Sequence, residues 1–553
     1  MGTDVKLQLI PSFETHPDRY KHWSLSVDGA VARLALCIDE TNGLRPDDYL
    51  LKLNSYDMGV DLELHDAVER LRFEHPAVRS VVITSDLPRI FCAGANIRML
   101  ASSAHGFKVN FCKYTNETRC GLEEATRESG QTYIAALNGT ASGGGYELAL
   151  ACEEIYLIDD GTAAVSLPEV PLLGVLPGTG GLTRLVDKRM VRRDLADLFC
   201  TKAEGYRTRD AKKFDLIDGG FPRSKWDDGM VQVAAAAAAR NPARDPNGVV
   251  LPPIEVQGDH TGDRTYKYVR LTLDPAARTA TLTVLGPDTP APADAAALRA
   301  EAANTWGFRA FRELEDALLH LRFNHPTLGL ILFRTEGDSA AVLAHDAVLH
   351  DSSGDWFADE LTWYRGRVLR RVDNMARSMF AIIEEGSCFS GTLFELAQAC
   401  DRQYMLEDDD GAVAIQLNSA NAGLYPMVTN VSRLGTRFAG SAEALANALA
   451  QTAPMDGPAA EDMGLVTMSL DDIDWEDEVR IAIEERASLS PDALTGMEQN
   501  LRFVGAENCD TKIYGRLTAW QNWIFQRPNA VGDEGALTMF GHPERPTFDW
   551  TRT

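Results

Sequence analysis

Two segments of this chain, about 250 residues apart, repeat the same pattern. Leu-Arg-Phe-Glu-His-Pro at residues 71–76 returns as Leu-Arg-Phe-Asn-His-Pro at residues 321–326. A second pair follows in the same order, because Glu-Leu-Ala-Leu-Ala-Cys at residues 147–152 matches Glu-Leu-Ala-Gln-Ala-Cys at residues 395–400. Two matches in register predict a duplicated unit, which limits the chain to folds that can be built twice in tandem.

Local patterns around the first repeat identify the kind of unit. Residues 62–70 and 312–320 carry apolar side chains at i, i+3 and i+4 spacing, which predicts helices with one buried face. The runs that follow, at residues 81–83 and 330–333, consist of Val, Ile, Leu and Phe and are typical of parallel strands covered on both faces. We therefore expect an α/β protein in which a βα-type unit occurs twice.

Turn-forming residues divide the chain. Between the copies lie Asn-Pro-Ala-Arg-Asp-Pro-Asn-Gly at residues 241–248 and then Pro252-Pro253, which discourage regular structure. Toward the C-terminus, predicted helices carry Trp520, Trp523, Ile524 and Phe525. We predict a catalytic unit, a linker, a second unit and a C-terminal helical cover at residues 1–240, 241–260, 261–487 and 488–553.

Charge and composition exclude several classes of function. The chain has 81 acidic and 54 basic residues, a formal charge of −27, whose field repels nucleic acid and anionic membranes. The sequence has neither a signal-peptide apolar stretch at its N-terminus nor a run of about 18 apolar residues. Nine cysteines without a CxxC pair, and histidines without an HExxH motif, indicate neither a disulfide frame nor a metal centre. We expect a cytoplasmic protein with no metal or organic cofactor and no nucleic-acid or membrane partner.

Two glycine turns each connect a predicted strand to a predicted helix. One is Phe-Cys-Ala-Gly-Ala-Asn-Ile at residues 91–97, and the other is Asn-Gly-Thr-Ala-Ser-Gly-Gly-Gly-Tyr-Glu-Leu-Ala at residues 138–149. Such turns leave unpaired backbone amides at a helix start, and two that face one point form an oxyanion hole for a thioester or ester oxygen. Taken alone, each turn is weak evidence, and an ordinary strand-to-helix loop is the favoured alternative.

Two glutamates lie in apolar contexts. Glu147 lies just inside the helix after the glycine run, and Glu169 follows Pro168 and precedes Val170-Pro171. Neighbouring carboxyl groups in a desolvated site have pKa values that are raised and separated, which suits one as base and the other as acid toward a water molecule. The alternative for each is a helix cap or an ion pair with a basic neighbour.

Together these motifs resemble the crotonase (enoyl-CoA hydratase/isomerase) superfamily. They occur in family order over about residues 25–215, with Gly-Val-Leu-Pro-Gly-Thr-Gly-Gly at residues 174–181 as the last. The resemblance implies a crotonase-like spiral of ββα turns and acyl-CoA substrates. It implies an oxyanion hole from the amides of Ala95 and Gly144, with Glu147 and Glu169 at the acid/base positions. Asn96 stands where Asp is common, which leaves a backbone role intact but changes the capping residue.

Other candidate site residues surround these motifs. Cys112 lies in a segment that commonly lines the acyl pocket of this superfamily, and Lys113 would lower its thiol pKa if the side chains meet. The alternative for Cys112 is a buried small apolar residue. Arg45, Lys52 and Arg98 are candidates for the coenzyme A phosphates, with a solvated surface charge as the alternative for each. The remaining substrate-binding candidates belong to the glycine turns and are Ala93, Asn96, Gly143 and Gly145.

The second copy is expected to be degenerate. Its counterpart of the glycine run is Ser390-Gly391-Thr392, and no counterpart of the turn at residues 91–95 follows Asp338. Asn418 aligns opposite Glu169, so that Glu395 alone remains of the two carboxylates. We predict a structural unit, such as a fused partner or a pocket wall, in place of a second active site.

The tandem length and the segment at residues 520–532 resemble a ring-cleaving branch of the superfamily over the whole chain. This resemblance implies a carbon–carbon lyase that converts 2,3-epoxybenzoyl-CoA (dihydrodiol form) and water into 3,4-didehydroadipyl-CoA semialdehyde and formate in aerobic benzoate degradation. The alternatives are a generic enoyl-CoA hydratase/isomerase with a fused second domain and a non-catalytic acyl-CoA-binding scaffold. Because crotonase shells usually trimerise and the internal copy could here replace a neighbour, we expect a homo-oligomer, with a dimer favoured.

Overall fold

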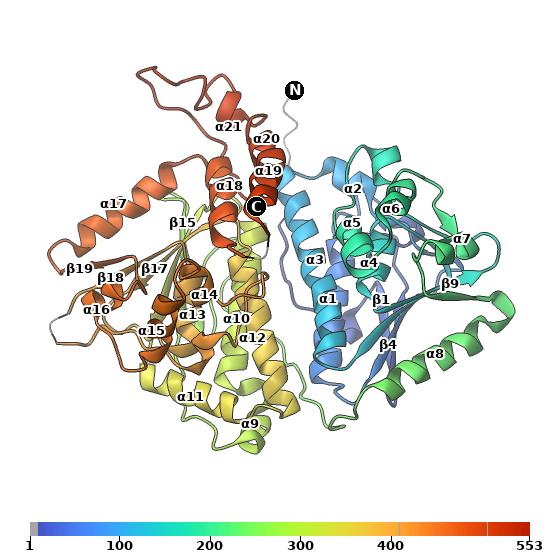
Figure 1. Cartoon of the computed structure of the whole chain (residues 1–553), viewed down its shortest axis with the longest axis horizontal. Helices are drawn as coiled ribbons and strands as arrows, with labels where there is room; N and C mark the ends of the chain where they lie inside the picture. The colour runs from blue at the N-terminus through green and yellow to red at the C-terminus, as the bar shows by residue number, and fades with distance from the viewer. Residues whose placement is uncertain (1–8, 409, 506) are drawn as a thin grey trace. The chain divides into compact units, whose positions relative to one another are not determined.

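A computed structural model describes residues 9–408, 410–505 and 507–553, and the chain divides into two compact units (Figure 1). The first unit spans residues 12–252; the second comprises residues 253–553 and a short segment around Ile10. The boundary falls inside the segment expected as a linker. The first half of that segment packs on the first unit, since Val249 and Leu251 are buried and the Val249 amide donates to the Phe73 carbonyl at 2.7 Å.

The first unit is built on a six-stranded sheet in which only the first strand is antiparallel to its neighbour. Its central strands are almost continuously apolar, because helices cover both faces. In sheet order the strands are β1 (Trp23–Asp28), β2 (Val31–Leu36), β4 (Ser80–Ser85), β7 (Thr132–Leu137), β9 (Glu154–Asp159) and β12 (Gly219–Pro222). Its main helices are α1 (Met58–Phe73), α3 (His105–Arg127), α4 (Gly144–Ala151) and α8 (Trp226–Arg240).

Short strands after the main strands carry the loops of the site. A four-stranded sheet has the order β11-β10-β8-β5, and β3 pairs with β6 in parallel. These strands are β11 (Tyr206–Arg207), β10 (Ala164–Ser166), β8 (Gly139–Ser142), β5 (Arg89–Cys92), β3 (Ser55–Tyr56) and β6 (Gly94–Ala95). Both predicted glycine turns therefore lie at strand ends, followed by α2 (Ile97–Ser102) and by α4.

The second unit repeats the first sheet with one strand added, which confirms the predicted duplication of an α/β unit. Its parallel core, from β15 to β18, has the same order and direction as the strands from β2 to β9. In sheet order the strands are β13 (Arg264–Thr265), β14 (Val269–Asp274), β15 (Thr279–Leu285), β16 (Leu330–Glu336), β17 (Ser378–Ile383), β18 (Arg402–Leu406) and β19 (Met468–Leu470). The helices α10 (Trp306–Asn324), α12 (Trp356–Asp373) and α13 (Gly391–Ala399) take the places of α1, α3 and α4.

One difference between the copies bears directly on function. In the first unit, β4 is followed by the glycine turn of β5 and β6, whereas in the second unit β16 leads through Asp338 straight into α11 (Ser339–Asp351). Asp338 caps this helix, since its side chain accepts from the Ala340 amide at 2.9 Å. The second unit therefore has a helix where the first has one wall of its site.

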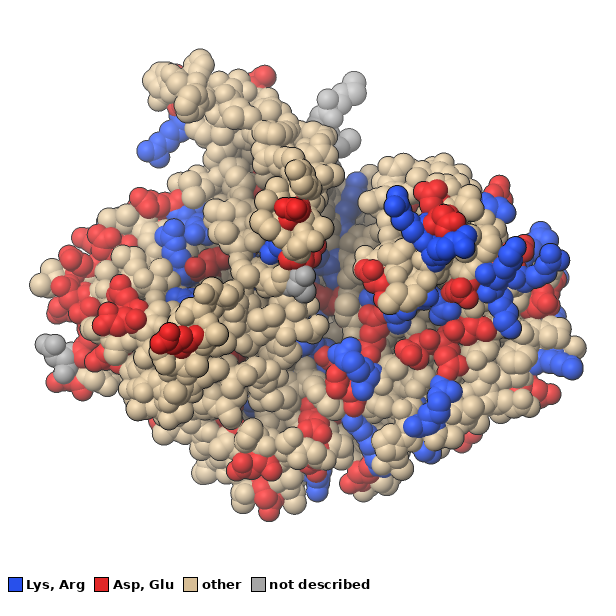
Figure 2. All heavy atoms as spheres, in the orientation of Figure 1, with Lys and Arg blue, Asp and Glu red and all other residues tan. Residues whose placement is uncertain are grey.

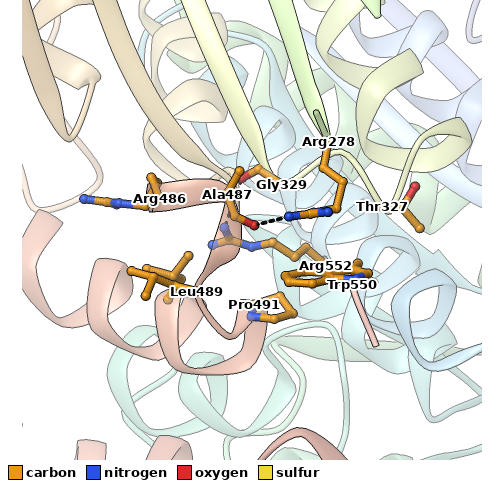
Figure 3. Close-up of a pocket in the computed structure, with 10 residues that line it drawn as sticks. Arg278, Thr327, Gly329, Arg486, Ala487, Leu489, Pro491, Trp550 and Arg552 are labelled. Atoms are coloured by element: carbon orange, nitrogen blue, oxygen red, sulfur yellow. Dashed lines mark hydrogen bonds between the residues drawn. The ribbon is translucent and has the colours of Figure 1, made fainter. Parts of the chain in front are cut away.

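The C-terminal region begins with α17 (Trp475–Ser488), α18 (Pro491–Arg502) and α19 (Cys509–Arg516), followed by the short helices α20 (Asn522–Ile524) and α21 (Pro528–Val531). Irregular chain follows and returns to the second unit (Figure 3). There the Arg278 guanidinium lies 3.8 Å from the centroid of the Trp550 ring and donates to the Ala487 carbonyl at 2.7 Å. Buried Arg552 pairs with Glu498 at 2.6 Å.

Acidic side chains gather over one part of the second unit, around α16 (Gly457–Asp462), β19 and α17 (Figure 2). The exposed acidic residues there are Glu461, Asp462, Asp471, Asp472, Asp474, Glu476, Asp477 and Glu478. No helix of the described residues is long and apolar enough to cross a membrane.

Candidate active site

A cavity of about 440 Å³ opens in the first unit where the two glycine turns meet helix α3. The segment around residues 168–179 forms another side of the cavity. The wall of the cavity is mostly apolar and includes Phe111, Leu173, Val175 and Leu176. The predicted residues that line it are Ala93, Ala95, Cys112, Gly143, Gly144, Glu147 and Glu169.

The two glycine turns touch at the point where the oxyanion hole was predicted. Gly94 has φ +87°, and a Cβ there would lie 2.9 Å from the Gly144 nitrogen, so only glycine permits this approach. Gly144 is the first residue of α4, where the amide has no intrahelical acceptor. Tyr56 lies opposite Ala95 in the parallel pair β3–β6, and the backbone carbonyl of Tyr56 accepts from the Asn96 amide at 2.8 Å. Because successive amides of a strand point to opposite sides, the Ala95 amide is directed away from β3. Two adjacent backbone donors therefore border the cavity.

Asn96 and Gly145 support this arrangement from behind. The Asn96 side chain caps α2 by accepting from the Met99 amide at 3.0 Å, and its Nδ2 donates to the Leu50 carbonyl at 2.8 Å. The Asn at this position thus keeps a capping role. Gly145 packs on Cys92, since a Cβ would lie 2.5 Å from that carbonyl oxygen. Neither Asn96 nor Gly145 is among the residues that line the cavity.

Glu147 is held by backbone amides. Its side chain is buried, and Oε1 accepts from the Thr179 and Gly181 amides at 2.9 Å each. Gly181 must be small, because a Cβ there would lie 2.9 Å from the same oxygen. The glycine motif at residues 178–181 therefore orients this carboxylate.

Glu169 has a different environment. It is 9% exposed, and its Oε2 has no hydrogen-bond partner among the described residues. Burial, with a further contribution from the negative charge of Glu147, raises the pKa of Glu169 to about 7. A carboxyl group with this pKa exchanges protons readily near neutral pH, as a general acid or base must.

Cys112 also lines the cavity, where the charge of Glu147 acts on it. A Cβ on Gly178 would lie 2.9 Å from its Sγ. Burial, followed by the charge of Glu147, raises the pKa of the Cys112 thiol to about 11. The lowering expected from Lys113 is therefore wrong, because desolvation disfavours the thiolate. The thiol stays protonated near neutral pH and can donate a hydrogen bond or a proton.

The structure brings a buried cation to the cavity that we did not predict from the sequence. Arg119, on α3, lines the cavity and pairs with Asp61 of α1 at 2.9 Å. Asp61 also accepts from the Tyr56 hydroxyl at 2.7 Å and the Thr118 hydroxyl at 2.7 Å. The available signal was helical spacing, since Cys112, Thr115 and Arg119 follow one face of α3.

A second hollow, of about 580 Å³, shares Ala93, Ala95 and Ile97 with the cavity. Lys52 and Arg98, two of the candidates for the coenzyme A phosphates, line this hollow. Arg45 is not among its lining residues. Instead, the Arg45 guanidinium donates to the Met99 carbonyl, Ser102 and Ser103 and pairs with Asp48 at 3.2 Å. Arg45 thus tethers α2 to the preceding loop.

The retained carboxylate of the second unit is neutralised internally. Glu395, the counterpart of Glu147, pairs with Arg433 at 2.9 Å and accepts from the Asn421 side chain at 2.8 Å. Arg433 also pairs with Asp373 at 2.7 Å. Among the described residues of the whole chain, no group of three His, Cys, Asp or Glu side chains could hold a metal ion.

Comparison with known proteins places these features in context. A family model described as enoyl-CoA hydratase/isomerase matches residues 51–244. The chain is 52% identical over 546 residues to the benzoyl-CoA-dihydrodiol lyase of Aromatoleum evansii, and the match covers 98% of each chain. Among solved structures, an enoyl-CoA hydratase from Geobacillus kaustophilus is 31% identical and DspI from Pseudomonas aeruginosa is 22% identical. Their TM-scores are 0.35 and 0.34, with 40% and 41% of this chain and 75% and 83% of theirs covered.

Proposed function

The chain belongs to the enoyl-CoA hydratase/isomerase family, and on this premise we propose that it acts as a benzoyl-CoA-dihydrodiol lyase. The observation that carries the proposal is the 52% identity over 98% of both chains. That match includes the second unit and the C-terminal region, which a single hydratase unit does not need. The enzyme is a carbon–carbon lyase of the aldehyde-lyase type.

The proposed substrate is 2,3-epoxybenzoyl-CoA, which two water molecules convert into 3,4-didehydroadipyl-CoA semialdehyde and formate. Cleaving a carbon–carbon bond next to a thioester requires a place for the electron pair that is released. The thioester carbonyl supplies it by forming an enolate, whose oxygen the amides of Ala95 and Gly144 would stabilise. Loss of one donor of this kind typically costs roughly 3–4 kcal/mol of barrier.

The two glutamates divide the proton transfers. Glu169 has an unpartnered oxygen and a pKa of about 7, so it can take a proton from water and return it to the departing oxygen. Glu147 is fixed by the Thr179 and Gly181 amides, which suits a carboxylate that orients water. Cys112, as a protonated thiol, would donate to an oxygen of the acyl group. Because amides and side chains supply these functions, the reaction needs no metal or organic cofactor beyond the substrate's own coenzyme A.

The test is formate release from enzymatically generated 2,3-epoxybenzoyl-CoA, measured beside hydration of crotonyl-CoA. We expect formate from the unmodified protein and a large fall in its rate of release, to a small residual activity, in Glu147→Gln and Glu169→Gln. Glu395→Gln is the matched control, since Glu395 occupies the position of Glu147 in the second unit, and it should still release formate. Crotonyl-CoA hydration without formate would favour a generic hydratase, and acyl-CoA binding without either reaction would favour a scaffold.

We also propose a homodimer located in the cytoplasm. All nine cysteines are free thiols, as a reducing compartment would maintain them. Light scattering of the purified protein tests the dimer, and a mass of one chain would contradict it. Fractionation of the producing cells tests the location.

A further inference from the structure

We propose that Arg119 binds a negatively charged oxygen of the acyl group, next to the oxygen held by the Gly144 amide. The identity of that oxygen rests on the proposed function: it is the oxygen on the ring carbon beside the one that bears the thioester. The binding role itself rests on the geometry of the two units, taken one at a time and compared.

The first observation is the state of Arg119 in the cavity wall. Its side chain is almost completely buried, and Nη1 donates to Asp61 at 2.9 Å and to the Thr115 carbonyl at 3.0 Å. Because Arg119 also lines the cavity, its positive charge acts on a ligand bound there.

The second observation is that the duplicated unit keeps this arginine. Arg365 lies on α12, which takes the place of α3. In each unit the arginine packs over an aromatic ring at the start of the preceding long helix, which is α1 in the first unit and α10 in the second. Arg119 lies 5.4 Å from the centroid of the Tyr56 ring, and Arg365 lies 5.7 Å from that of Trp306. Tyr56 and Trp306 correspond through the repeat that defines the two copies. The two arginines therefore occupy equivalent places.

The second unit fills the equivalent site with its own carboxylate. Asp346 of α11 pairs with Arg365 Nη1 through Oδ1 at 3.1 Å. Its Oδ2 accepts from the Thr392 amide at 2.7 Å. Thr392 corresponds to Gly144, since both directly follow the glycine of their turn and stand three residues before the matched glutamate. One carboxylate thus bridges the arginine and the amide of the oxyanion position.

Asn418 completes this correspondence. Aligned with Glu169, it donates through Nδ2 to Asp346 Oδ2 at 3.1 Å. A Cβ on Gly391 would lie 2.3 Å from that oxygen, just as a Cβ on Gly143 would lie 2.5 Å from Glu169. Asp346 therefore lies among the counterparts of the groups that line the cavity of the first unit.

The first unit retains the arginine and the amide but opens the space between them. Its segment after β4 is the glycine turn in place of helix α11, and Arg119 takes its ion-pair partner from α1, where Asp61 stands in place of Phe311. Asp346 thus marks the position of an anion that the first unit takes from its ligand. The two carboxylate oxygens of Asp346 lie close together, as do the thioester oxygen and the oxygen on the neighbouring ring carbon of the proposed substrate. A simple enoyl-CoA lacks the second oxygen, so Arg119 would favour the ring substrate.

The test uses 2-hydroxybenzoyl-CoA, an aromatic thioester that carries an oxygen at this position and does not turn over. Its phenol is titrated by ultraviolet absorbance when bound. A facing guanidinium should lower the bound phenol's pKa by about one unit or more relative to the free compound. We expect this shift in the unmodified protein and in Arg365→Gln, and its loss in Arg119→Gln. An unshifted phenol in the unmodified protein, or a full shift in Arg119→Gln, would overturn the proposal.

A second measurement covers the case in which Arg119→Gln does not fold. In Asp346→Ala the equivalent site of the second unit is vacated, so formate should raise the melting temperature of this variant by more than it raises that of the unmodified protein, in which Asp346 occupies the site. No formate-dependent stabilisation would overturn the inference that this arginine and amide bind an anion. Neither experiment requires turnover, so a failure of the proposed reaction would be visible separately in the formate assay.

Discussion

A Cβ on Gly143 would lie 2.5 Å from Oε1 of Glu169, the carboxyl group whose pKa is raised to about 7. Gly143 also has φ +53° and precedes the amide of Gly144. The residue that allows the turn thus also leaves room for the proton-transfer group.

Gly143→Ala should therefore lower kcat by on the order of 100-fold, because it displaces Glu169 from its position in the cavity. Gly161→Ala is the control for backbone strain, since Gly161 has φ +77° with nothing within 4 Å of a Cβ. Formate release by both variants is measured at equal folded protein. Equal losses would mean that strain, and not Glu169, accounts for the effect.

The pH dependence of kcat/KM should show an inflection near pH 7 from Glu169. In Glu147→Gln the residual activity should inflect at lower pH, because the charge of Glu147 contributes to the raised pKa. The change should be partial, since burial is the larger cause. The measurement is a pH profile with saturating and subsaturating substrate, and an unchanged inflection would argue against coupling of the two carboxyl groups.

Glu169→Gln should stabilise the protein at pH 8. The folded protein binds a proton at Glu169 up to about pH 7, while the unfolded chain releases it near 4.5, so stability falls as pH rises through this window. Removing the ionisable group should raise the free energy of unfolding by roughly 1–3 kcal/mol at pH 8. Urea unfolding at pH 8 and at pH 5 checks this, and the gain should shrink at the lower pH.

Cys112 should resist alkylation at pH 8, because its thiol pKa is raised to about 11. If it donates a hydrogen bond or proton, Cys112→Ser should keep activity within about tenfold and Cys112→Ala should lose more. Iodoacetamide labelling followed by peptide mass analysis, with exposed Cys509 as the reference, tests the first statement. Rapid labelling of Cys112 would contradict a protonated thiol.

Glu395→Ala should destabilise the second unit by roughly 3–5 kcal/mol, because it leaves Arg433 with one fewer partner in a buried ion-pair network. Glu147→Ala removes a different kind of contact, since Oε1 of Glu147 accepts from the backbone amides of Thr179 and Gly181. Calorimetric unfolding of the two variants should therefore differ, with the larger loss in Glu395→Ala. The reverse order would contradict a structural role for Glu395.

The sequence by itself determined the repeat, the two glycine turns and the two glutamates. These features are local. A glycine before a helix start and a 3.6-residue period are patterns of neighbouring residues, so they can be recognised without knowledge of the fold. The predicted degeneracy of the second copy had the same basis, since Asn418 could be aligned with Glu169 by sequence alone.

Only the tertiary structure decided what those residues contact. Glu147 meets the Thr179 and Gly181 amides, and Arg119 meets Asp61, across separations that no local pattern encodes. The contacts of Arg45 with α2 and Asp48 also depend on the fold, although its position in the sequence made it a candidate for phosphate binding. Desolvation is likewise a property of the packed cavity: burial raises the pKa values of Glu169 and Cys112, and burial exists only once distant segments have closed around them.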